Sequence, residues 1–164
     1  MWQLNLQEES PWRAINDGVM GGVSQARYRA CEAGGCFEGN LSLANGGGFA
    51  SVRRPVRLPD QTGALRLRVR GDGKRYQLRL RTHSALDGVV YAVVFAAPAE
   101  TWREVTFSLK DFTATYRGRP VDDAPPLQWS EVQQLGLLIA HQQAGPFALT
   151  LASIQAVQTE AFSH

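Results

Sequence analysis

The sequence predicts an all-β domain, a sandwich or barrel of antiparallel strands. Apolar and polar residues alternate with period two in roughly ten short segments, which is the pattern of strands with one buried face. Glycine-rich turn sequences separate these segments at regular intervals. Helical periodicity is nearly absent, so we expect at most one or two short helical turns, over residues 127–134. Many short strands at regular spacing are typical of sandwiches and barrels.

The composition is that of a single soluble domain, and residues 1–164 are interpreted as one. Seventeen basic residues against 15 acidic ones give a net charge of +2, which provides no general attraction to nucleic acid or to anionic membranes. No apolar run approaches the roughly 18 residues of a spanning helix, and the first nine residues do not resemble a targeting segment. We therefore expect a cytoplasmic protein without membrane insertion.

The first third of the chain predicts four strands, at residues 2–6, 24–30, 36–43 and 49–53. The second and third should pair through a turn at residues 32–35, and Trp12 should lie in the core. Alternation in the fourth strand places Phe49, Ser51 and Arg53 on one face. Cys31 and Cys36 could face each other across the turn, although a reducing cytosol favours two structural thiols over a disulfide.

The middle of the chain has the clearest pattern. Residues 65–70 and 76–81 alternate between apolar side chains and arginine or glutamine, with Asp72-Gly73 between them. Asp-Gly between alternating runs predicts a β-hairpin, and the strands that follow, at residues 89–95 and 102–109, would extend it as a meander. The polar face of that hairpin would carry five arginines: Arg66, Arg68, Arg70, Arg79 and Arg81.

This arginine face has two interpretations. A sheet with one buried face must have one solvated face, so the simpler interpretation is an ordinary surface. The alternative is a basic floor that binds carboxylates, phosphates or sugar hydroxyls, which Arg53 and Arg119 could join. An RNA-binding sheet is not strongly indicated, because aromatic stacking platforms do not alternate with the arginines.

The end of the chain predicts two buried strands, at residues 135–140 and 147–154. His141 follows the first of them, so it either packs at the edge of the core or lines the loop edge of the sandwich. We include it among the candidate binding residues.

Residues 16–24, Asn-Asp-Gly-Val-Met-Gly-Gly-Val-Ser, form a shaped loop. Glycine permits positive φ and close approach of a ligand, and Asn16 and Asp17 can hydrogen-bond neighbouring amides. We interpret Asn16, Asp17, Met20 and Ser24 as the rim of a recognition site. The loop does not link a strand to a helix, as a nucleotide-binding glycine motif would.

A catalytic apparatus is not evident. Ser24 or Ser51 could be combined with His141 and Asp17 into a triad, but no nucleophile motif supports this. The three histidines are too scattered for a metal site, so we expect no metal. Since motifs for nucleotide binding and for a catalytic nucleophile are also not evident, we expect no cofactor and no enzymatic activity.

Taken together, several blocks resemble the complex I intermediate-associated protein 30 family over about residues 12–155. These blocks are Trp12, the loop at 16–22 with Ser24, Phe37-Glu38-Gly39, Gly47-Gly48-Phe49-Ala50-Ser51 with Arg53, Arg70-Gly71-Asp72-Gly73 with Tyr76, Trp102, Phe107, Phe112, Gly118-Arg119, Gly136-Leu137-Leu138-Ile139 and Gly145-Pro146-Phe147. The resemblance implies a galactose-binding-domain-like jelly-roll sandwich. It also implies a chaperone-like role, because mitochondrial members of the family act as assembly factors for NADH:ubiquinone oxidoreductase.

The resulting hypothesis is a non-catalytic binding or assembly module with a protein partner, which could be a respiratory-complex assembly intermediate. Its candidate binding residues are Asn16, Asp17, Met20, Ser24, Arg53, Arg79, Arg81, Arg119 and His141. A carbohydrate-binding module is the alternative, and an RNA-binding domain is a further one.

Overall fold

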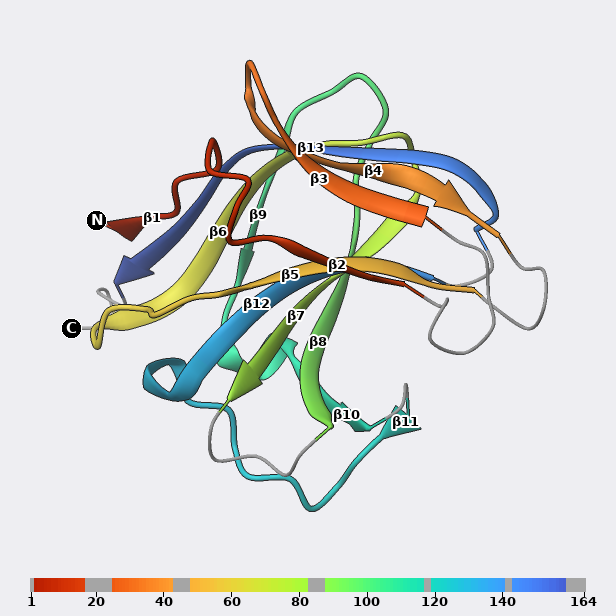
Figure 1. Ribbon diagram of the computed structural model, residues 1–164. Coiled ribbons are helices and arrows are strands. Elements are labelled where there is room, and N and C mark those ends of the chain that lie inside the picture. Colours follow the sequence, from red (N-terminus) through yellow and green to blue (C-terminus); the bar gives the residue numbers. More distant parts are fainter. Residues whose placement is uncertain are drawn as a thin grey trace.

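The computed structural model describes residues 2–16, 25–42, 48–82, 88–116, 119–140 and 143–158. Within these ranges the chain forms two antiparallel β-sheets that pack face to face (Figure 1). The all-β sandwich expected from the sequence is confirmed. None of the helices in this part of the chain is long and apolar enough to cross a membrane.

The first sheet holds six strands in the described part of the chain. Five of them follow the order β3-β4-β13-β6-β9, and β1 pairs with the C-terminal part of β13. Its strands are β1 (Trp2–Gln3), β3 (Gln25–Cys31), β4 (Gly34–Leu41), β6 (Thr62–Arg70), β9 (Arg103–Phe107) and β13 (Gly145–Gln158). The β3–β4 pair and the strands near both ends of the chain were predicted from the alternation.

The second sheet holds seven strands among the described residues, in the order β11-β10-β8-β7-β12-β5-β2. Its strands are β2 (Arg13–Asn16), β5 (Ala50–Pro55), β7 (Arg75–Thr82), β8 (Val89–Ala96), β10 (Thr113–Tyr116), β11 (Arg119–Pro120) and β12 (Val132–Ile139). Two short 3₁₀ turns, η3 (Leu109–Asp111) and η4 (Trp129–Glu131), lie between strands. The second of these falls in the segment where a short helical turn was expected.

The core lies between the inner faces of the two sheets. The inward positions of β6 and β7 are fully buried, as period-two alternation requires: Leu65, Leu67, Val69, Tyr76, Leu78 and Leu80. Aromatic rings join the two layers, since the ring centroid of Tyr76 on β7 lies 6.1 Å from that of Phe37 on β4 and 6.4 Å from that of Phe147 on β13. Trp12 is buried, as predicted, and stacks on Tyr28 with ring centroids 4.2 Å apart.

The predicted hairpin of residues 65–81 is wrong. Strand β6 pairs with β13 and β9, whereas β7 pairs with β8 and β12 in the other sheet. The Asp72-Gly73 turn exists, with Gly73 at φ +87°, but it carries the chain across from one sheet to the other. The turn instead bonds to the segment that follows β8, through Gly71 N–H to the Pro98 carbonyl and Gly73 N–H to the Ala97 carbonyl.

Two consequences follow from this crossing. The five arginines do not share a face, because Arg66, Arg68 and Arg70 belong to the first sheet and Arg79 and Arg81 to the second. The predicted meander is also wrong beyond the β7–β8 pair, because β9 returns to the first sheet beside β6. Alternation identifies a buried face, but it does not identify the neighbouring strand.

The β3–β4 pair also settles the geometry of the two cysteines. Cys31 lies opposite Gly34 and Cys36 lies opposite Arg29, so the cysteines do not face each other across the turn. Both are free thiols, and Cys36 is buried. Burial and the neighbouring Glu38 raise the pKa of Cys36 to about 11, which makes it a poor nucleophile at neutral pH.

The carboxylate of Asp72 ties the crossing to both sheets. Its oxygens accept hydrogen bonds from the Tyr76 hydroxyl at 3.0 Å and from the Ala148 amide of β13 at 2.9 Å. It also accepts from the Lys74 amide at 3.2 Å. Burial and the Asp72 carboxylate raise the pKa of Tyr76, which therefore remains a hydroxyl donor. One side chain thus bonds to β7 of the second sheet and to β13 of the first.

We expect Asp72→Ala to lower the free energy of unfolding by about 2 to 3 kcal/mol, because it leaves the fully buried Tyr76 hydroxyl without its acceptor. Urea unfolding measures this loss. In the background Tyr76→Phe the same substitution should cost clearly less, since the donor is already absent. Equal losses in both backgrounds would show that the Tyr76 bond is not what Asp72 contributes.

Candidate functional site

A hollow of about 860 Å³ lies on the outer face of the second sheet, over strands β7, β12, β5 and β2. Figure 1 shows these strands side by side in one layer of the sandwich. The side chains that line it alternate with core residues along each strand: Ile15, Phe49, Ser51, Arg53, Gln77, Arg79, Arg81, Gln134, Leu138 and Ala140. Strand pairing across the sheet therefore determines which of them are neighbours.

The strand register arranges the floor in rows. Arg79 of β7 lies opposite Gly136 of β12, which lies opposite Arg53 of β5, and Arg53 lies opposite Arg13 of the edge strand β2. On its other side Arg79 lies opposite Ala92 of β8. Arg79 therefore stands between two residues with small or absent side chains, which leaves open space above the row.

The rows on either side differ in character. Toward one end, Arg81 lies opposite Gln134. Toward the other end, Gln77 lies opposite Leu138, which lies opposite Ser51. The Ser51 hydroxyl donates to the Ile15 carbonyl and so fixes β2 against β5. The hollow thus has a cationic half and a half with apolar and uncharged polar side chains.

The cationic half carries charge at an electrostatic cost. Burial, with Arg81 and Arg53 close by, lowers the pKa of Arg79 to about 10. Burial and the neighbouring Arg13 also lower the pKa of Arg53. Within the described residues no carboxylate forms an ion pair with Arg53 or Arg79, and the Arg79 guanidinium donates to the uncharged Gln77 side chain at 3.2 Å. At neutral pH both arginines remain cations, so the floor attracts an anion.

The structure brings together three of the nine candidate binding residues, since Arg53, Arg79 and Arg81 all line this hollow. Arg119 is exposed on β11, at the far edge of the same sheet, and does not line it. Asn16 ends β2, where its backbone lies opposite Ala50. Asp17, Met20, Ser24 and His141 lie outside the described residues, so their role stays a prediction.

Sequence reasoning missed the glutamines and the glycine of the floor. Gln77 and Gln134 alternate with core residues and look like any solvated strand position. Gly136 interrupts an apolar strand, and a glycine inside a strand is a known sign of close approach by another chain or a ligand. A Cβ at Gly136 would lie 3.0 Å from the Val52 carbonyl oxygen and 3.2 Å from the Arg53 Cβ.

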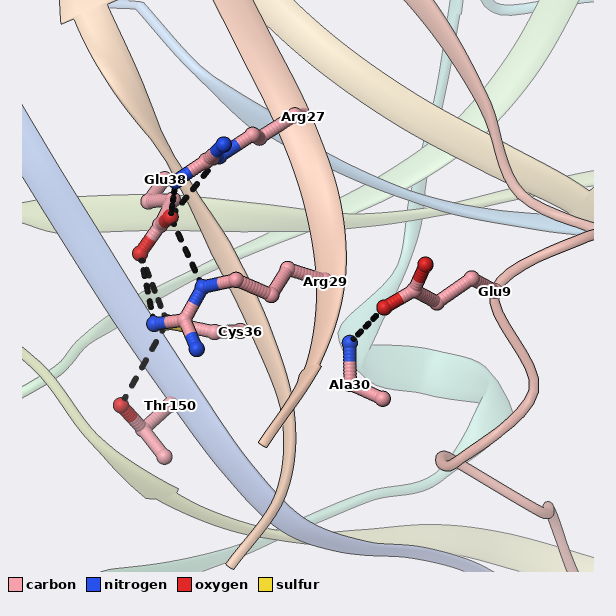
Figure 2. A network of polar contacts seen from close by, with 7 residues as sticks. All are labelled: Glu9, Arg27, Arg29, Ala30, Cys36, Glu38 and Thr150. Atoms are coloured by element: carbon pink, nitrogen blue, oxygen red, sulfur yellow. Dashed lines mark hydrogen bonds and ion pairs between the residues drawn. The ribbon is translucent and has the colours of Figure 1, made fainter. Parts of the chain in front are cut away.

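A second arginine cluster, on the outer face of the first sheet, provides a contrast (Figure 2). The Glu38 carboxylate accepts from Arg27 Nε at 2.9 Å, from Arg29 Nε at 3.0 Å and from Arg29 Nη2 at 3.1 Å. The Cys36 thiol lies 3.3 Å from the same carboxylate. Here the chain supplies its own carboxylate, so both arginines have an anionic partner.

The chemistry available in the hollow is binding chemistry. Guanidinium groups offer forked donors to planar anions, and the glutamine side chains offer both donors and acceptors. In the part of the chain that the structure describes, no group of three or more His, Cys, Asp or Glu side chains is placed to hold a metal ion.

The sequence matches the model of a known protein family over most of its length. The family model of complex I intermediate-associated protein 30 (CIA30) matches residues 2–151. An uncharacterized protein of Schizosaccharomyces pombe is 26% identical over 172 residues, which cover 91% of this chain and 78% of that protein.

Solved structures with the same fold are carbohydrate-binding modules and an agarase. The family 11 carbohydrate-binding module of Clostridium thermocellum, in complex with a β-1,3-1,4-mixed-linked tetrasaccharide, has a TM-score of 0.63 at 11% identity, and 96% of each chain is covered. The agarase AgWH50C has a TM-score of 0.59 at 9% identity, covering 96% of this chain and 26% of that one. At these identities the likeness shows the fold alone, a jelly-roll β-sandwich.

We expect Arg79→Gln to raise the thermal midpoint by about 2 to 4 °C, which corresponds to roughly 1 kcal/mol for a domain of this size. The folded state depresses the Arg79 pKa to about 10, so the unfavourable charge is fully present below that pH and is relieved as the pH rises above it. The gain should therefore be complete at pH 7 and shrink above pH 10. Arg75→Gln, at an exposed position on the same strand, is the control and should leave the midpoint nearly unchanged. A lowered midpoint for Arg79→Gln would contradict this account of the floor.

Glu38 should make the stability depend on pH in acid. Hydrogen bonds from Arg29, then those from Arg27 and Cys36, lower the pKa of Glu38 from 4.5 to about 2. Its contribution is therefore present above pH 4.5 and lost as the pH falls toward 2. We expect the free energy of unfolding of the wild type to exceed that of Glu38→Gln by roughly 1 to 2 kcal/mol at pH 7, allowing for solvent screening. This difference, measured by urea unfolding, should decrease steadily below pH 4.5. A gap that stays constant from pH 6 to pH 3 would count against this ion-pair cluster.

Proposed function

Because the chain belongs to the complex I intermediate-associated protein 30 family, we propose that it is a non-catalytic module that binds a protein partner over the arginine-lined hollow. The partner we propose is an assembly intermediate of NADH:ubiquinone oxidoreductase, in line with the family's description. Family membership supports an assembly role, and the arginines of the hollow support this surface as the place where the partner binds.

One observation carries this proposal more than any other. Arg53 and Arg79 are partly buried on adjacent parts of one floor, and among the described residues neither has a carboxylate partner. Burying a guanidinium without a counter-charge destabilises the free protein, whereas a partner that supplies the counter-charge recovers that energy on binding. Arginine is also among the residues most often found at the energetic centre of protein interfaces.

The lining of the hollow suits an acidic protein better than a carbohydrate. Carbohydrate binding remains the second candidate, because the C. thermocellum module of the same fold was solved with a tetrasaccharide. The amides of Gln77 and Gln134 could hydrogen-bond sugar hydroxyls here. Phe49 is the aromatic side chain that lines the hollow within the described residues, which gives little stacking surface beside three cations. The charge therefore favours a protein with acidic groups over a neutral glycan.

The test is affinity capture from the native cell with quantitative identification of what is bound. We expect wild-type protein to enrich subunits of NADH:ubiquinone oxidoreductase, and the variant Arg53→Ala with Arg79→Ala to lose at least nine-tenths of that enrichment. The matched control removes two arginines from the opposite sheet, Arg66→Ala with Arg68→Ala, and should capture as wild type does. Thermal melts of all three proteins confirm that they are folded.

Two results would overturn the proposal. Equal enrichment by the Arg53 and Arg79 variant would place the partner elsewhere on the surface. Absence of oxidoreductase subunits, together with calorimetric binding of a β-1,3-1,4-linked tetrasaccharide, would establish the carbohydrate alternative instead.

A further inference from the structure

We propose that the hollow binds an extended, acidic segment of the partner, with one carboxylate seated above Gly136 between Arg53 and Arg79 and an apolar side chain against Phe49 and Leu138. This inference rests on the proposed function and adds to it the chemistry that is recognised. Arg79, Gly136, Leu138 and Arg53 lie on three adjacent strands of one sheet, and Phe49 immediately precedes β5.

The seat for the carboxylate follows from the strand register. Arg79 and Arg53 are two strands apart with Gly136 between them, so their Cα atoms are separated by roughly 10 Å, given the usual strand spacing of about 4.8 Å. Two arginine side chains can span that distance from opposite ends. Because Gly136 has no side chain, a small planar group can rest on the floor and accept hydrogen bonds from both guanidinium groups.

The charge of the seat selects an anion. Arg79 has Arg53 and Arg81 close by, and both lower its pKa together with burial. Glu38, Glu104 and Asp72 form their ion pairs with Arg27, Arg29, Arg66 and Lys74, and none of these four cations lines the hollow. A carboxylate from the partner would supply the counter-charge that Arg53 and Arg79 lack among the described residues, as Glu38 does for the cluster in Figure 2.

The spacing of the rows selects an extended chain. Along β7, Arg81, Arg79 and Gln77 are successive outward positions, so their rows are about 6.7 Å apart. Residues i, i+2 and i+4 of an extended peptide have the same spacing and project on the same side. A segment lying along β7 and β12 would therefore place acidic residues at Arg81 and Arg79, and an apolar residue at the third row, which holds Leu138, with Phe49 lining the hollow two residues before Ser51 of that row.

The probe is a fluorescein-labelled peptide, Ser-Glu-Ser-Glu-Ser-Leu-Ser, acetylated and amidated so that its ends carry no charge. Fluorescence polarisation measures its binding to the full chain. We expect replacement of both glutamates by glutamine to weaken binding at least tenfold, and replacement of leucine by serine to weaken it about threefold. The affinity for the glutamate peptide should also fall as salt is raised.

Variants locate the seat. Arg53→Gln and Arg79→Gln should each bring the affinity for the glutamate peptide close to that for the glutamine peptide. Arg75→Gln, also on β7 but outside the hollow, is the control and should bind as wild type does. Thermal melts show whether each variant is folded, and retained binding by a folded Arg79→Gln protein would overturn the seat.

The outcomes separate this inference from the function on which it rests. If glutamate and glutamine peptides bind alike, or neither binds, the carboxylate seat is wrong, even where capture of oxidoreductase subunits depends on Arg53 and Arg79. If the peptide binds as expected but the arginine variants still capture those subunits, the seat is right and the proposed function of the hollow is wrong.

Discussion

The architecture depends on the rim where the chain crosses from one sheet to the other. A buried tyrosine hydroxyl needs an acceptor, and Asp72 provides it while also accepting from the backbone of β13. The same short turn bonds to the segment after β8, which crosses in the opposite direction. A Cβ at Gly71 would lie 2.4 Å from the Ala97 Cβ, so these two crossings can lie this close only because one of them has glycine there. This rim decides that the arginines of β6 and of β7 face opposite sides of the molecule, and it leaves Arg79 and Arg81 beside Arg53.

Local pattern explains what could be predicted of the fold. Alternation placed Leu65, Leu67, Tyr76 and Leu78 in the core correctly, because the period of two is a property of each strand alone. The Asp-Gly turn was also predicted correctly, since Gly73 takes the positive φ that such turns need. What failed was the identity of the neighbouring strand: β6 lies beside β13, whose paired residues are between 80 (Thr150 and Arg70) and 96 (Gln158 and Thr62) positions away in the sequence. A hairpin and a crossing between two sheets have the same local pattern, so only the tertiary structure separates them.

The site was predictable to the extent that it lies within single strands. The face shared by Phe49, Ser51 and Arg53 was predicted from the alternation of one segment, and all three residues line the hollow. The row Arg79, Gly136 and Arg53 could not be derived in this way, because it needs the register of three strands that are not consecutive in the sequence. The Glu38 cluster is the opposite case: its members lie on the consecutive strands β3 and β4, and both arginines find a carboxylate within one hairpin.

The two arginine clusters show why the fold alone does not identify the ligand. Both stand on the outer faces of sheets in the same sandwich, which this chain shares with carbohydrate-binding modules. In one cluster a carboxylate of the chain accepts hydrogen bonds from Arg27 and Arg29, so both arginines already have an anionic partner. In the other, glycine and alanine occupy the positions beside Arg79 where an acidic side chain could have stood, and burial keeps competing water partly away. The open capacity for an anion is therefore a property of particular residues on the sheet, and a neutral sugar would leave it unused.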